Sequence, residues 1–219
     1  DLDTGEFLDD ELPQTTGSVA WAQDNKTVFY TQKDAQTLRP NKVYKHILGT
    51  DPEEDELIYH ESDDTFYTYA YTTKSNDYII IASSSNLSNE YRILKADQPD
   101  GTFEVFEPRE RKHEHQIGHF GNHFYILTNW KARNFRLMKT PVEKTEKKYW
   151  EEVIPHREDV LLMDVELFDE YMALSERVEG ITSIRVRRYD GSEDHYVDFG
   201  ESAYYSTISV NKNFDTQTV

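Results

Sequence analysis

The stretch VFYTQKDAQTLRPNKVYKHIL, Val28 to Leu48, holds two runs rich in β-branched and aromatic residues, separated by a polar loop. Such residues favour strands over helices. Pro40 fixes its own φ and pushes Arg39 toward extended backbone, so a strand is expected to begin cleanly after the Leu-Arg-Pro that ends the loop. The stretch therefore predicts two consecutive strands joined by a loop.

The same pair of strands recurs along the chain. The first member of each pair follows a turn signal and reads VFYT at 28, YIII at 78, FYIL at 124 and YMAL at 171. The second member reads VYKHIL, YRIL, FRLM and SIRV, and a further strand follows each at Glu56, Phe103, Trp150 and His195. Each series repeats at roughly 45 to 50 residues, the period of four-stranded propeller blades. The sequence predicts an all-β fold, a β-propeller with complete blades at about 18–61, 65–109, 114–157 and 160–199.

The two ends of the chain are expected to be partial blades. Residues 1–12 resemble the turn and fourth strand of a preceding blade, and residues 203–219 resemble the first strand and turn of another. Because a propeller normally closes its ring to avoid open strand edges, we expect this chain to be a fragment of a longer protein. Alternatively, the two partial blades combine into an irregular fifth blade.

Composition excludes several classes of function. The formal net charge is −18, with 42 acidic and 24 basic residues, which argues against a nucleic-acid partner or an anionic membrane surface and leaves two interpretations, cationic partners or simple solubility. There is no apolar run of membrane-spanning length, and the N-terminal residues lack the pattern of a signal peptide. With no cysteine, the chain has no disulfide and no thiolate nucleophile or metal ligand.

Several segments, in blade order, carry a family resemblance. They are FYTQKD with TLRPNKVYKHILGT, DDTFYTYAYTTKSNDYIII, NEYRILKAD, NHFYILTN, ARNFRLMKTPV and WEEVIPHREDVLL. Together they resemble the propeller of the oligopeptidase B group within the prolyl oligopeptidase family of serine peptidases. The resemblance implies a seven-bladed propeller that caps an α/β-hydrolase domain, whose Ser-Asp-His triad cleaves short peptides after Arg or Lys. It also implies that the propeller gates access and excludes folded proteins.

The catalytic apparatus of that family is expected to lie outside this chain. A nucleophile elbow needs G-x-S-x-G, and no such string occurs here. The chain itself is thus expected to have no catalytic residue, no cofactor and no peptidase activity, and to work with an α/β-hydrolase domain of the same polypeptide on short basic peptides. The resemblance leaves a cytoplasmic or a periplasmic parent open. The alternative is a standalone propeller that serves as a protein-interaction scaffold.

Two segments have the residue types of metal sites. The run HEHQIGHFGNH contains four histidines, but Gly118 and Gly121 and the repeat pattern make it a hairpin, which should keep the imidazoles apart. Imidazoles packed on strand faces or hydrogen-bonded to backbone are expected instead. The acidic run Asp51 to Glu56 lacks the alternating ligands and glycine of a calcium loop, so a solvated turn is expected there. No metal site is predicted.

Sorting the predicted loops by the end of the sheet from which they emerge separates the charges. Loops between second and third strands, and between fourth and first strands of successive blades, hold most of the loop cations and nearly balance their own acidic residues. The opposite loops have few cations, so one end is expected to be close to neutral and the other strongly acidic. The family resemblance places the catalytic domain over the cation-bearing end. Five arginines there are candidates for interdomain ion pairs or for binding substrate carboxylates, unless they are merely solvated surface residues: Arg39, Arg109, Arg111, Arg133 and Arg157.

Overall fold

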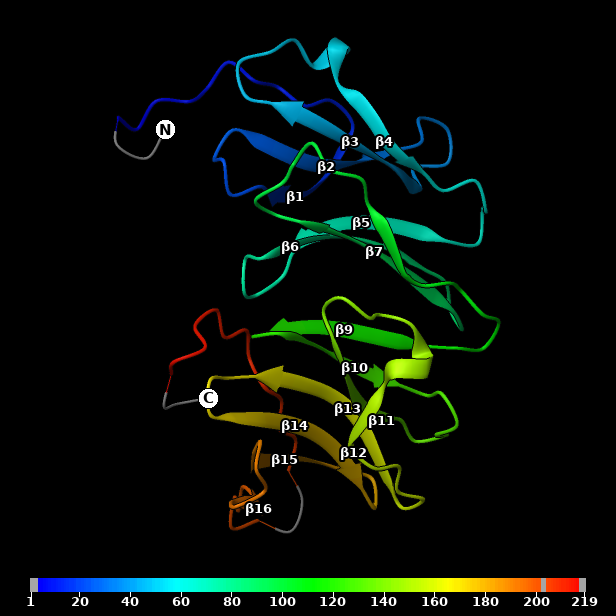
Figure 1. Cartoon of the computed structure of the whole chain (residues 1–219), viewed down its shortest axis with the longest axis vertical. Helices are drawn as coiled ribbons and strands as arrows, with labels where there is room; N and C mark the ends of the chain where they lie inside the picture. The colour runs from blue at the N-terminus through cyan, green and yellow to red at the C-terminus, as the bar shows by residue number, and fades with distance from the viewer. Residues whose placement is uncertain (1–3, 202–203, 217–219) are drawn as a thin grey trace. The chain divides into compact units, whose positions relative to one another are not determined.

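The chain forms antiparallel β-sheets almost throughout. The computed structural model describes residues 4–201 and 204–216. It contains four sheets of four strands each, and in every sheet the strands lie side by side in chain order (Figure 1). This confirms the predicted all-β propeller architecture. Of the expected partial blades, residues 1–3, 203 and 217–219 lie outside the described part, and the described residues 4–14 and 204–216 contain no strand, so partial blades there remain a prediction.

The strands alternate with short connections, and the only helices in the described residues are two single 3₁₀ turns, Pro52–Glu54 and Lys147–Tyr149. None of the described helices could cross a membrane. The first two sheets consist of β1 (Thr15–Trp21), β2 (Thr27–Lys33), β3 (Pro40–Ile47) and β4 (Glu56–His60), then β5 (Tyr67–Thr72), β6 (Tyr78–Ser84), β7 (Asn89–Lys95) and β8 (Glu104–Glu107). The other two consist of β9 (His115–Phe120), β10 (His123–Thr128), β11 (Arg136–Pro141) and β12 (Glu151–Ile154), then β13 (Val160–Leu167), β14 (Tyr171–Val178), β15 (Ile181–Arg188) and β16 (Asp194–Tyr196).

The second strand of each sheet is the most deeply buried. Every residue of β6 except the last is buried, and β2, β10 and β14 are nearly as enclosed. A strand covered on both faces reads as a continuous apolar run rather than as an alternation. The four strings that revealed the repeat are therefore the parts of the sequence whose composition the fold constrains most.

Similar turns join the first strand of a sheet to the second. In the first two sheets an asparagine, Asn25 or Asn76, adopts a positive φ of 54° or 60°, and Gly121 at 60° does so in the third. Asparagine and glycine tolerate this left-handed region better than other residues. The turn signals in the sequence therefore mark the hairpin positions correctly.

The chain divides into two compact units, residues 1–112 and 113–219. In the first unit, a core formed by Ala20, Phe29, Ala70, Ile79 and Ile81 with their neighbours is built from both sheets. The first strands β1 and β5 are close neighbours, since Ser18 Oγ donates to Ala70 O at 3.0 Å and Thr72 Oγ1 donates to Trp21 O at 3.3 Å.

In the second unit, the core again draws on both sheets, with Leu127, Leu137 and Ile154 from one and Leu162, Met172 and Leu174 from the other. The segment after β16 packs on the same unit. Phe214 lies against Phe120 with ring centroids 5.0 Å apart, and Asp169 N donates to Phe214 O at 3.0 Å. In each unit the inner faces of adjacent sheets thus supply one shared apolar core.

Candidate functional site

In a four-stranded antiparallel sheet, the second-to-third loop and the linker that follows the fourth strand emerge at the same end. We call this the loop end of a sheet. It comprises residues 34–39 and 61–66 in the first sheet, 85–88 and 108–114 in the second, and 129–135 and 155–159 in the third. The five arginines predicted from the sequence all lie in these segments.

One arrangement recurs at three loop ends: a side chain of the second-to-third loop donates hydrogen bonds to backbone carbonyls of the linker. In the first sheet the donor is Arg39. In the second, Ser88 Oγ donates to Glu110 O at 2.9 Å. In the third, Asn134 Nδ2 donates to Arg157 O at 3.1 Å and to Glu158 O at 2.8 Å. Because linkers lack a strand partner for these carbonyls, the side chains satisfy them and hold each linker against the sheet that it leaves.

Arg39 makes the most extensive of these contacts. Its Nη1 donates to Asp63 O at 2.8 Å and to Phe66 O at 2.7 Å, and its Nη2 donates to Glu61 O at 3.3 Å. Its side chain is only 13% exposed, and Asp64 lies 3.9 Å away as an exposed counter-ion. The guanidinium therefore holds the linker of its own unit.

Arg109 belongs to a buried ionic network at the same end of the first unit. Its Nη2 lies 2.5 Å from Glu61 Oε2 and 3.3 Å from Glu90 Oε1, and its backbone N–H donates to Glu90 Oε2 at 3.0 Å. The guanidinium also lies over the ring of Phe66, 4.1 Å from its centroid. Tyr59 completes the network by donating its hydroxyl to Glu61 Oε2 at 2.7 Å.

These contacts set the charge of the two glutamates. Burial alone would raise the pKa of Glu61, but the hydrogen bonds from Arg109, Tyr59 and the Asp63 N–H outweigh it and lower the pKa to about 2. Burial likewise acts to raise the pKa of Glu90, but the hydrogen bonds from Arg109 and the positive charge of Arg92 outweigh it and lower that pKa. Both carboxylates are therefore ionised at neutral pH, although each is almost fully buried.

Arg157 occupies a comparable network in the second unit. Its Nη2 pairs with Oε1 of Glu176, a fully buried residue of β14, and its Nη1 donates to Tyr196 Oη at 3.1 Å. Arg185 Nη1 lies 3.3 Å from the same glutamate oxygen, and Tyr196 donates to Glu176 Oε2 at 2.6 Å. This network ties the linker after β12 to the second and fourth strands of the next sheet.

Arg111 and Arg133 differ from the other three. Both are exposed, and neither forms a hydrogen bond or ion pair with any residue in the described part of the chain. Of the five candidates, these two present their guanidinium groups to solvent at the loop ends. The remaining three, Arg39, Arg109 and Arg157, bind within their own unit and do not behave as solvated surface residues.

The histidine run forms the predicted hairpin of β9 and β10, but one expectation about it is wrong. His113 and His115 stack with ring centroids 4.7 Å apart, because residues two apart in extended backbone point to the same side. His113 Nε2 lies 3.0 Å from Thr128 Oγ1, and His119 packs on Phe124 as expected for a strand face. Within the described residues no group of three or more histidine or acidic side chains is placed to hold a metal ion.

The acidic run also departs from the predicted solvated turn at one position. Asp51 caps a 3₁₀ turn and is exposed, but the side chain of Asp55 is only 3% exposed. Asp55 Oδ1 lies 2.8 Å from His46 Nδ1, and Asp55 Oδ2 accepts from Tyr30 Oη at 2.9 Å. His46 Nε2 lies 2.9 Å from Asp10 Oδ1, so the buried imidazole links the segment before β1 to the first sheet.

The sequence reasoning found the arginines but missed the glutamates that pair with them, Glu61, Glu90 and Glu176, and the two other side chains that hold linkers, Ser88 and Asn134. One signal was available for Glu176, because an acidic residue that follows YMALS in a buried strand requires a cationic partner. Several charged side chains at the loop ends are therefore held in ion pairs within their own unit, whereas the guanidinium groups of Arg111 and Arg133 are exposed. Such an arrangement can position the linkers and can bind a ligand or a neighbouring domain.

Comparisons with known proteins agree with this architecture. A family model described as "Prolyl oligopeptidase, N-terminal beta-propeller domain" matches residues 1–219. Dipeptidyl aminopeptidase BI of Pseudoxanthomonas mexicana is 39% identical over 98% of this chain and 30% of its own length, and protease 2 of Moraxella lacunata is 31% identical over 100% and 31%. The solved structure of oligopeptidase B from Leishmania major has a TM-score of 0.78 at 26% identity, covering 93% of this chain and 28% of that one.

A second solved structure, oligopeptidase B from Trypanosoma brucei with covalently bound antipain, has a TM-score of 0.79 at 28% identity and covers 88% of this chain and 28% of that one. The chain thus spans about a third or less of the length of the relatives it matches. Since the family model matches every residue and the four sheets have the expected order, the chain belongs to the prolyl oligopeptidase family, as its N-terminal β-propeller domain.

Proposed function

We propose that this propeller is the gating portion of a serine oligopeptidase that cleaves short peptides after basic residues. The catalytic Ser, Asp and His would belong to an α/β-hydrolase domain elsewhere in the same polypeptide, which fits the small share of each relative that this chain covers. The observation that carries the proposal is the whole-length match to the family's propeller, combined with loop ends whose linkers are held by side-chain tethers.

Tethered linkers favour a gate because they present a defined surface to a neighbouring domain. In this proposal Arg111 and Arg133 make the interdomain or substrate contacts, since their guanidinium groups are exposed. Arg39, Arg109 and Arg157 act indirectly, by holding the linkers from which such contacts are made. Arginine suits the role because its planar fork can bind carboxylates through two hydrogen bonds.

A preference for basic peptides is supported by charge. The formal net charge of −18 attracts cationic substrates over long range and raises their local concentration near the propeller. The resemblance of the sequence to the oligopeptidase B group implies the same substrate class, and two solved structures that the chain matches are oligopeptidases B.

A second candidate is removal of dipeptides from free N-termini. It is favoured by the 39% identity to a dipeptidyl aminopeptidase. The two candidates share a propeller and a serine nucleophile, and they differ in whether the substrate needs a free amino terminus.

The intact protein that contains this propeller should be tested on three fluorogenic substrates: an N-blocked peptide ending in arginine, the same peptide ending in proline, and an unblocked dipeptide. We expect the highest kcat/KM for the blocked arginine peptide. Preference for the unblocked dipeptide would establish the second candidate, and preference for proline would contradict the basic specificity. Inactivity on all three, with an intact serine nucleophile, would favour the interaction scaffold.

Gating requires a separate measurement. The same arginine-containing cleavage sequence should be offered as a short peptide and as an exposed loop of a folded protein. We expect cleavage of the peptide alone, because the propeller should exclude folded chains. Comparable rates on both would contradict a size filter even if the specificity for arginine were correct.

A further inference from the structure

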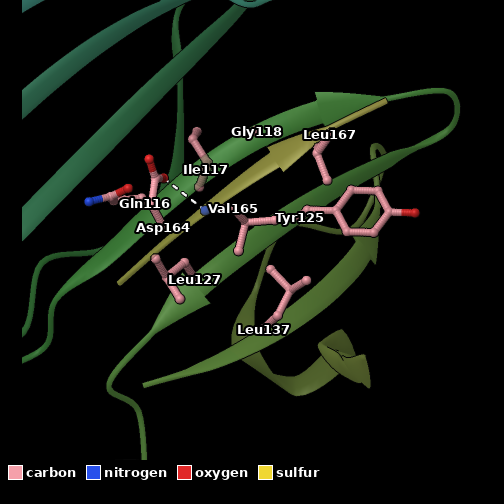
Figure 2. A pocket seen from close by; sticks show the side chains of 9 residues that line it. All are labelled: Gln116, Ile117, Gly118, Tyr125, Leu127, Leu137, Asp164, Val165 and Leu167. Atoms are coloured by element: carbon pink, nitrogen blue, oxygen red, sulfur yellow. Dashed lines mark hydrogen bonds between the residues drawn. The ribbon is translucent and has the colours of Figure 1, made fainter. Parts of the chain in front are cut away.

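The second unit contains a cavity between its two sheets. Its walls come from β9, β10 and β11 on one side and from β13 on the other, and its volume is about 190 Å³. The side chains of Leu127, Leu137 and Leu167 line it and are almost fully buried. Figure 2 shows these apolar groups gathered around the space, with Val165 opposite Leu127 and Leu137.

One end of the cavity is polar. Asp164 and Gln116 both line it and both are exposed, so they form a hydrophilic rim beside the apolar walls (Figure 2). Asp164 Oδ1 accepts from the Val165 N–H at 2.8 Å. No side chain in the described part of the chain donates to Asp164 Oδ2, which leaves one carboxylate oxygen for a ligand.

Local backbone structure creates this rim. The pairing of β13 with β14 is interrupted between Leu162 and Asp164, where one extra residue is inserted. Such a bulge changes the direction of the side chains that follow it. On the opposite wall, Gly118 leaves space because it has no side chain, and a methyl group there would lie 3.3 Å from Leu167 Cδ1.

The size of the cavity limits what it can hold. An apolar protein cavity of about 150 Å³ is enough to bind a molecule the size of benzene. A space of about 190 Å³ therefore accommodates a short hydrocarbon stem, of the length of one large side chain. An apolar stem would occupy the leucine-lined part, and a cationic head would reach the carboxylate at the rim.

From these features we infer that the cavity binds a primary amine carried on an apolar stem, with the stem among Leu127, Leu137 and Val165 and the ammonium group on Asp164. The amine can come from a free alkylamine or from a lysine side chain of a peptide. Either ligand would match the acidic character of the chain. This site lies entirely on propeller residues and goes beyond the proposed peptidase role.

The test is a calorimetric titration of the intact protein with isopentylamine and with isopentanol, its uncharged counterpart of the same shape. We expect saturable binding of the amine and weaker binding of the alcohol, by up to about fivefold, the most that an exposed ion pair usually provides. Asp164→Asn should reduce amine affinity by a similar factor while leaving alcohol affinity unchanged. Asp159→Asn, an exposed acidic residue just before the same strand, is the matched control and should bind like wild type.

A second variant tests the apolar part. Leu127→Phe should fill the cavity and abolish binding of both compounds. Gly118→Ala should weaken binding because the added methyl group makes the cavity narrower, and it requires no new backbone conformation. Unchanged amine binding in Asp164→Asn, unchanged binding of both compounds in Leu127→Phe and Gly118→Ala, or equal affinity for amine and alcohol in the wild type, would overturn the inference. Titration with lysine blocked at both ends identifies the source: binding as tight as that of isopentylamine supports a peptide ligand, and binding of isopentylamine alone supports a free amine.

Discussion

Arg109 Nη2 lies 2.5 Å from Glu61 Oε2, across 48 residues of sequence, and this ion pair joins the end of the second sheet to the linker that leaves the first. The glutamate is 4% exposed and the guanidinium packs on the ring of Phe66. Removing one member of such a pair leaves a buried charge without its partner, which costs more than the pair itself contributes.

Arg109→Met should therefore destabilise the first unit by about 3 kcal/mol, because buried Glu61 loses its cationic partner and Glu90 keeps only Arg92, 2.6 Å away. Chemical denaturation followed by tryptophan fluorescence measures the change. Arg111→Met, two residues along the same linker but exposed, is the control and should change stability by less than about 0.5 kcal/mol. Equal losses of stability from the two substitutions would show that the network stabilises the first unit no more than an exposed charge does.

Acid should weaken the same network. The pKa of Glu61 in the folded chain is about 2, below its ordinary value of 4.5, so its stabilising contribution is complete above pH 4.5 and is lost as the pH falls toward 2. Glu61→Gln should lower stability at pH 7 and reduce the loss of stability between pH 4.5 and 2. Denaturation curves across this range measure both effects, and a Glu61→Gln slope identical to that of the wild type would contradict the assignment.

Much of the fold could be predicted because burial constrains composition. The strings YIII and YMAL are continuous apolar runs, since second strands are covered on both faces, and their spacing revealed the repeat. Turn positions followed from residues that tolerate a positive φ, such as Asn25 and Asn76. These are local properties, and a sequence displays them directly.

The candidate site was predictable only in part. Topology placed all five arginines at loop ends, but which of them are free depends on partners far away in the sequence, such as Glu61 for Arg109. Asp55 shows the same limit, because its neighbours in the chain are acidic and exposed, whereas His46 and Tyr30 decide its burial. Residue spacing alone does not show such pairings.

Alkaline conditions should release the segment that precedes β1. Burial acts to lower the pKa of His46, but its hydrogen bonds with Asp55 and Asp10 outweigh burial and raise it above 6.5. The stabilisation that protonated His46 provides is therefore complete below pH 6.5. It is lost as the pH rises through the pKa that His46 has in the folded chain. A spin label on the variant Phe7→Cys reports this, since Phe7 is fully exposed and the chain has no other cysteine.

We expect the label to become more mobile as the pH rises from 6 toward 9, because His46 loses its proton. Adding Asp10→Asn should make it mobile at every pH, whereas Asp9→Asn, an exposed neighbour, should leave the wild-type profile unchanged. A pH-independent signal in the otherwise unmodified chain would show that His46 does not control the segment.

His115, one of the two stacked histidines, should make the folded chain less stable in acid. Burial, with smaller contributions from His113 and Lys147, lowers the pKa of His115 to about 3. The folded chain keeps this imidazole neutral, and the unfolded chain protonates it below pH 6.5, so stability falls as the pH drops from 6.5 toward 3.

Between pH 6.5 and 5 the fall due to His115 should be at most about 1.4 kcal/mol per pH unit. His115→Leu should flatten the stability profile over this range, even if it lowers stability at neutral pH. His195→Leu, which removes an exposed histidine from β16, is the control and should keep the wild-type slope. A slope that persists in His115→Leu would assign the acid sensitivity to other groups.

Asn134 and Arg133 are adjacent residues with different expected effects. Substitution of Asn134 should change stability, and substitution of Arg133 should change catalysis. Asn134 donates to two linker carbonyls, whereas Arg133 is exposed. Asn134→Ala should cost about 1–3 kcal/mol, because both carbonyls lose a donor, and Arg133→Glu should leave stability nearly unchanged. If Arg133 contacts the catalytic domain or the substrate in the intact protein, Arg133→Glu should lower kcat/KM for short peptides.

Arg39→Glu completes the comparison, because Arg39 holds a linker and is largely covered. It should resemble Asn134→Ala and destabilise the propeller, with any change in kcat/KM accompanied by loss of stability. Denaturation curves and peptide kinetics on the three variants distinguish direct contact from positioning. Unaltered kinetics and stability in Arg133→Glu would remove this residue from the proposed gate. The linker-holding role of Arg39 and Asn134 would be unaffected, since it depends on hydrogen bonds within each unit.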